Sequence, residues 1–167
     1  AIVGAELEAL RIDVRQGRAE EALPSIEEKL GKLRAWRVRC NAGEPVSEAP
    51  SDQRLDGTLI VGLNIAEQAN RSLEHWQACV DLVREIEELK RVRGESMHGI
   101  ARTRINMAFP LIRLGKLPEA KSLLEGCRNI FRQAGDIKGE ADALSSLADV
   151  WNESHDPSHA VAFERGA

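Results

Sequence analysis

A helix–turn–helix pattern recurs along this chain about every 40 residues, and no other feature limits its possible folds as strongly. One copy has apolar residues at helical spacing, a turn at Gly115, and a second helical pattern that opens with Leu117-Pro118. Forty positions after Met107, Ala108, Leu111, Leu117 and Ala120 stand Leu147, Ala148, Trp151, Pro157 and Ala160. The pattern therefore predicts stacked pairs of antiparallel helices.

Two earlier copies precede this one. Asn64-Ile65-Ala66 lies 42 residues before Asn106-Met107-Ala108, and near the start Leu7, Leu10 and Val14 share one helix face ahead of Gly17. We expect a single all-α domain over residues 1–167, an α-solenoid of four antiparallel helix pairs. The four repeats are expected at about 3–40, 57–95, 98–136 and 138–167, with turns near Gly17, residues 72–75, Gly115 and residues 154–157.

Each helix pair carries an apolar stripe that only stacking can bury. The expected core therefore contains Met107, Leu111, Leu144, Leu147 and Trp151 on first helices, and Leu82, Val83, Ile86, Leu89, Leu123, Leu124 and Ile130 on second helices. Residues 41–56 have no helical period and many turn formers, which predicts a surface loop. Because the helical pattern begins at once and stops inside an expected helix, we expect the chain to be excised from a longer protein.

The clearest local motif runs from Gly115 to Ala120 and continues through Leu124, Cys127 and Phe131. This motif resembles the tetratricopeptide repeat family, in a form whose repeats exceed the usual length of about 34 residues. The resemblance covers nearly the whole chain except residues 41–56. It implies a right-handed superhelix whose concave groove holds an extended peptide or a partner helix.

The resemblance also implies which residues line that groove. An Asn before the Leu-Ala pair of a first helix contacts the ligand backbone in this family; Asn64 and Asn106 match it, with Ser146 in the last repeat. The predicted groove consists of Asn64, Glu67, Arg71, Arg102, Asn106, Phe109, Arg113, Asp142, Ser146 and Asp149. Because its third repeat is basic and its fourth acidic, we expect a bound segment to place acidic side chains near Arg102 and Arg113.

Charge and cysteine content narrow the classes of partner. Twenty-three Lys and Arg against 27 Asp and Glu give a net charge of −4, which provides no global attraction for nucleic acid or an anionic membrane. Three cysteines without metal-ligand spacing favour a reducing compartment. We therefore expect a cytoplasmic protein whose partners are proteins or peptides, not nucleic acid or membrane, with homo-oligomerisation as an alternative.

The sequence contains no motif for catalysis or for a cofactor. His155 and His159 have the i, i+4 spacing of metal ligands, but a turn at Asp156-Pro157 separates them, so we predict no metal site. His75 and His98 are interpreted as solvated turn residues, and Cys79 and Cys127 as buried thiols. We expect no enzymatic activity and no cofactor. The alternative function is a structural connector or self-association module whose groove is filled by its own chain.

Overall fold

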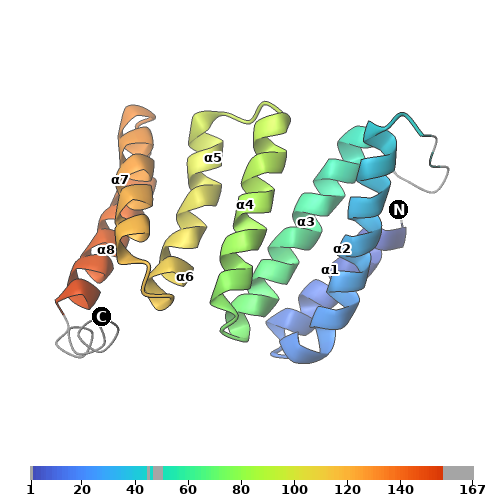
Figure 1. Cartoon of the computed structure of the whole chain (residues 1–167), viewed down its shortest axis with the longest axis horizontal. Coiled ribbons are helices and arrows are strands. Elements are labelled where there is room, and N and C mark those ends of the chain that lie inside the picture. The colour runs from blue at the N-terminus through green and yellow to red at the C-terminus, as the bar shows by residue number, and fades with distance from the viewer. Residues whose placement is uncertain (1, 45, 47–50, 156–167) are drawn as a thin grey trace, which may run out of the picture. The chain divides into compact units, whose positions relative to one another are not determined.

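The computed structural model describes residues 2–44, 46 and 51–155, and all regular structure in this part of the chain is helical (Figure 1). The all-α fold expected from the sequence is thus confirmed at the level of its elements. These are α1 (Ile2–Arg15), α2 (Ala19–Asn41), α3 (Asp52–Ser72), α4 (Trp76–Val92), α5 (Met97–Arg104), the 3-10 helix η1 (Ile105–Met107), α6 (Ala108–Arg113), α7 (Leu117–Gln133) and α8 (Ile137–Ser154). The chain divides into two compact units, Ala1–Leu89 and Lys90–Ala167.

The first unit has one apolar cluster to which all of its helices contribute. Helix α2 buries a stripe from Ala22 to Leu33, and α3 packs against it with Leu55, Leu59 and Leu63. Gly62 sets the distance between these helices, because a Cβ atom there would lie only 2.8 Å from Cδ2 of Leu30. Full burial of a leucine stabilises a fold by about 1.5–3 kcal/mol, so the buried leucines of both helices contribute to the stability of the unit.

In the second unit, α5, η1 and α6 follow one another as an interrupted helix, and α7 packs against this helix and against α8. The core between them includes Ala101, Cys127, Phe131 and Ala143. The interruption has a cause in the sequence. Pro110 has no N–H to donate to the carbonyl of residue 106, and its ring crowds that carbonyl, so the chain passes through a 3-10 turn at Ile105–Met107.

Three of the four predicted turns are where the sequence indicated. The backbone has φ of +83° at Gly17 and +71° at Gly115, a conformation that favours glycine, and residues 73–75 separate α3 from α4. Helix α8 ends before His155; residues 156 and 157 of the predicted fourth turn lie outside the described residues.

Two predictions about bounds and burial are wrong. The bounds of the loop predicted at 41–56 are wrong, because α2 includes Asn41 and α3 already begins at Asp52 and buries Leu55, which is 1% exposed. Trp151 and Leu144, predicted as core, are 61% and 43% exposed, because α8 buries a different face, with Gly139, Ala143 and Val150. The other predicted core residues are buried or half-buried: Met107, Leu111, Leu147, Leu82, Val83, Ile86, Leu89, Leu123, Leu124 and Ile130.

Candidate functional site

The second unit carries a row of four exposed side chains along the interrupted helix α5–η1–α6. Arg102, Asn106, Phe109 and Arg113 follow one another at intervals of four, three and four residues, which places them on one helix face. All four are exposed, and Phe109 is 49% exposed although it is a large apolar side chain. These residues, which we call the α5–α6 row, combine two cations, an amide and an aromatic ring on one surface.

A second row lies on α8, which contacts α6. Asp142 and Asp149 are exposed, and Ser146 between them is half-buried. Because these three residues are spaced four and three apart, they also share one helix face, the α8 row. The structure therefore places the predicted basic and acidic residues on two helices that touch within one unit.

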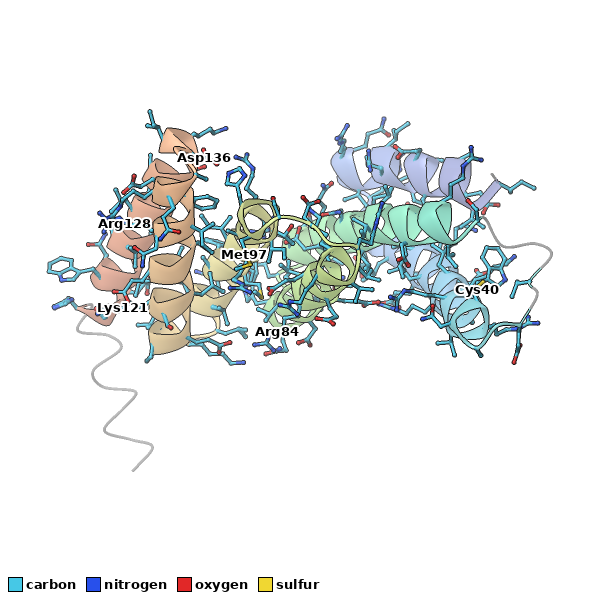
Figure 2. The ribbon with its side chains drawn as sticks, turned by 90° about the horizontal axis from the view of Figure 1, so that it is seen from above. Cys40, Arg84, Met97, Lys121, Arg128 and Asp136 are labelled. Atoms are coloured by element: carbon cyan, nitrogen blue, oxygen red, sulfur yellow. The ribbon has the colours of Figure 1, made fainter. Side chains whose placement is uncertain are left out.

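Asp136 contacts the first residue of the α5–α6 row and caps the helix that carries the α8 row. The Oδ1 of Asp136, which is labelled in Figure 2, accepts a hydrogen bond of 2.9 Å from the Gly139 N–H as the N-cap of α8. Its Oδ2 lies 2.8 Å from Arg102 and 2.8 Å from Nε2 of His98. The Gly139 N–H lowers the pKa of Asp136 most, with the His98 and Arg102 side chains adding to the effect, to about 2. Arg102 is thus held in position by a carboxylate of its own chain.

The interpretation of His98 as a solvated turn residue is wrong. His98 lies in α5, is half-buried, and packs edge-on against the Phe131 ring with 5.9 Å between centroids. His75 does lie in an exposed turn, where its Nδ1 is 3.1 Å from the side-chain oxygen of Asn70. The two histidines therefore differ in role, because His98 contacts both the Asp136 carboxylate and the buried Phe131 ring, whereas His75 lies in an exposed turn.

The remaining predicted groove residues lie in the first unit, on α3. Asn64 is exposed, and its side chain donates a hydrogen bond of 2.8 Å to the backbone carbonyl of Ile60 in the same helix. Glu67 is only 9% exposed and accepts a hydrogen bond of 2.8 Å from Nε of Arg71. The ten predicted residues thus form two separate sets, and in the first set Glu67 and Arg71 are engaged with each other.

The sequence did not reveal a cleft in the first unit. This cleft has a volume of about 1060 Å³ and lies between the start of α1, the middle of α2 and the start of α3, with Val3, Trp36 and Val61 among its apolar walls. Nζ of Lys32 lies 4.9 Å from the centroid of the Trp36 ring, and Lys29 pairs with Glu6 at 2.8 Å. The sequence contained one local signal of this cleft, because Trp36 follows Lys32 by one helical turn. The cleft itself is lined by residues of three helices, which no local pattern indicates.

Two of the three cysteines are buried in the core. Cys79 and Cys127 are fully buried as predicted, each with its sulfur 3.7 Å from a backbone carbonyl, and burial raises the pKa of Cys79 to about 11.

Within residues 2–44, 46 and 51–155, no three His, Cys, Asp or Glu side chains are placed to hold a metal. His155 stacks on Trp151, with 4.2 Å between the ring centroids, while His159 lies outside the described residues.

None of the described helices combines the length and the apolar character that a membrane crossing requires. Comparison with known proteins assigns no family: no protein-family model matches the chain, and no curated protein matches it with significant similarity. The resemblance to tetratricopeptide repeats therefore rests on the residues of this chain, and it remains a proposal.

Proposed function

We propose that this chain is a protein-interaction module, similar to tetratricopeptide repeats, that binds an extended peptide or a partner helix along the α5–α6 row. The observation that carries the proposal is the row itself. Arg102, Asn106, Phe109 and Arg113 stand exposed on one face of a helix whose opposite side is packed into a core. Surfaces that recognise proteins are enriched in such aromatic and arginine side chains.

Each member of the row suits a different part of a peptide. The half-exposed ring of Phe109 gives apolar contact area, and a guanidinium such as Arg113 binds a carboxylate through two parallel hydrogen bonds. The amide of Asn106 both donates and accepts, as a peptide backbone requires. The preferred partner is therefore a segment with an apolar residue between acidic ones.

The α8 row sets the direction of that segment. Asp142 and Asp149 are exposed on the helix that contacts α6, so basic side chains of the partner are stabilised on that side and acidic ones beside Arg113. Long-range attraction between these charges also speeds association and weakens as salt is added. In this proposal the module acts in the cytoplasm as a sensor or scaffold of a larger protein, without a cofactor and without catalysis.

The test starts from a random peptide library displayed on phage and selected on the full chain. The affinity of a selected peptide is then measured by calorimetry for the parent and for Phe109→Ala and Arg113→Glu. We expect each variant to weaken binding about tenfold or more, a change of about 1.4 kcal/mol or more. Lys121→Glu is the matched control, because Lys121 is exposed on α7 and the substitution makes the same change of charge.

A charge swap sharpens this experiment. A peptide whose acidic residue is replaced by lysine should regain affinity for Arg113→Glu and lose it for the parent chain. Circular dichroism confirms that both variants stay helical. Equal affinity of parent, Phe109→Ala and Arg113→Glu would place binding elsewhere, and no selected peptide at all would favour the alternative of a connector that associates with its own kind.

A further inference from the structure

The first unit contains a smaller pocket that shares no lining residue with the cleft beside Trp36. It has a volume of about 380 Å³ and is lined by residues of α2, α3 and α4. Its apolar wall consists of Leu30, Ala66, Ala78 and Leu82. Because Leu30 and Ala66 belong to the buried core cluster and Leu82 packs against it, the core holds this wall in place.

The charged residues of this pocket are mainly acidic. Glu27 of α2 and Asp81 and Glu85 of α4 contribute carboxylates, and the cation among the described lining residues is Arg34 of α2. Three carboxylates against one guanidinium leave an excess of negative charge beside the apolar wall. A ligand that fits the pocket must therefore combine an apolar part with a positive charge.

Arg34 shows how the acidic side of the pocket binds a cation. Its Nε and Nη2 donate hydrogen bonds of 2.8 and 2.6 Å to the two carboxylate oxygens of Glu85. The hydrogen bonding to Glu85 raises the pKa of Arg34 most, burial lowers it, and the charges of Glu85 and Glu27 raise it further. Glu27 therefore lies close enough to act on a cation in the pocket, while the chain itself already neutralises Glu85.

The other two carboxylates are not matched by a cation in this way. Glu27 is exposed and makes no hydrogen bond or ion pair with another described residue. Asp81 accepts a hydrogen bond of 2.9 Å from the uncharged Gln77 amide, and it lies 3.8 Å from Nη1 of Arg84. Because 3.8 Å is too long for a hydrogen bond, Asp81 retains the capacity to accept one from a charged donor.

We propose that this pocket binds a lysine side chain of a partner protein. The four-carbon stem of lysine covers the apolar wall, and the ammonium carries the positive charge that Glu27 and Asp81 attract. Lysine suits the pocket better than arginine, because the three donors of an ammonium can reach carboxylates on different helices. A guanidinium favours both oxygens of one carboxylate, and Glu85 already has such a partner. The proposal does not depend on peptide binding by the α5–α6 row.

The test uses two-dimensional NMR of the isotope-labelled full chain, titrated with Nα-acetyl-lysine N-methylamide as a probe for a lysine within a protein. We expect backbone amide signals of the residues that line the pocket to shift and to saturate. The norleucine analogue of the probe keeps the stem without the charge, and the Nε-acetylated probe keeps it with a neutral amide. Each should bind about tenfold more weakly or worse, because it makes no ion pair.

Substitutions of the charged residues have expected effects in both directions. Glu27→Gln and Asp81→Asn should each weaken binding of the lysine probe about two- to fivefold, as the loss of an exposed ion pair does. Arg34→Gln should strengthen it about two- to fivefold, because it releases Glu85 for the ammonium. Glu28→Gln is the matched control, since Glu28 is exposed on α2 outside this pocket, and it should leave the affinity unchanged.

Four results would overturn the proposal. The first is the absence of saturable shifts at the pocket, and the second is equal affinity of the parent and of a chain with both Glu27→Gln and Asp81→Asn. The third is equally tight binding of the norleucine analogue, because the apolar wall alone would then account for binding. The fourth is tighter binding of the corresponding arginine probe, which would assign the pocket to a guanidinium. Circular dichroism checks that each variant stays helical.

Discussion

Asp136 joins three parts of the second unit through one carboxylate. It caps α8, lies 2.8 Å from both Arg102 and His98, and has 13% of its side-chain surface exposed. Its pKa of about 2 is below the ordinary 3.8 because the folded state stabilises the charged form. The residue therefore contributes to stability while it is ionised.

The pH dependence of stability follows from the sign of this shift. A carboxylate whose pKa is lower in the folded state stabilises the fold fully above its unfolded pKa, and this contribution is lost as the pH falls from about 4 to about 2. We expect Asp136→Asn to lower the urea midpoint at neutral pH, with the difference from the parent shrinking towards pH 2. Asp142→Asn, an exposed carboxylate on the same helix, should change little at any pH. A constant difference across this range would show that the cap geometry, not the charge, matters.

At the scale of elements, local signals predicted the helical structure and three of the turns. Gly17 and Gly115 mark turns because glycine adopts positive φ without strain, and the apolar periods beside them have no other stable arrangement than helices. The start of α3 was missed because Ser51 to Asp56 are polar except for Leu55, and such a composition resembles a loop. Leu55 belongs to the same stripe as Leu59, four residues later, which was the overlooked signal.

Substitution of Leu55 tests whether α3 begins at Asp52. Because Leu55 is buried in the first unit's cluster, Leu55→Ala should reduce the free energy of unfolding by about 2–5 kcal/mol. Arg54→Ala, at the exposed neighbouring position, should change it by less than about 0.5 kcal/mol. Denaturant titration of both variants measures the change in the free energy of unfolding. Similar small changes in both variants would show that Leu55 lies in a surface loop.

Local spacing predicted only part of the candidate site, because one of its contacts joins residues far apart in sequence. The α5–α6 row follows from helical spacing alone, so Arg102, Asn106, Phe109 and Arg113 could be assigned to one face. The link between His98 and Asp136 joins positions 38 residues apart, and no local pattern indicates it. Trp151 was assigned to the core because its counterpart is Leu111, yet α8 buries the face with Gly139, Ala143 and Val150, so the correspondence between repeats did not show which face of α8 is buried.

At the scale of the whole molecule, the described helices belong to two compact units, Ala1–Leu89 and Lys90–Ala167. The larger cluster contains residues of α1 to α4, from Leu7 to Leu89, and a separate cluster contains Ala101, Cys127, Phe131 and Ala143. In repeat proteins, stability is approximately the sum of each repeat's own stability and of the interfaces between neighbours. We therefore expect that the substitution of a buried residue mainly destabilises the unit that contains it.

Hydrogen exchange followed by mass spectrometry measures this directly. Ile26→Ala removes a fully buried side chain of α2, and Phe131→Ala one of α7, with expected costs of about 2–5 and 3–5 kcal/mol. Each should speed exchange mainly in its own unit, residues 1–89 for the first variant and 90–167 for the second, because local opening follows local stability. Glu28→Ala and Lys121→Ala, at exposed positions of the same two helices, are the controls. If either core variant sped exchange equally in both units, the two would unfold as one cooperative structure, and the stability of any partner-binding surface would depend on the entire chain.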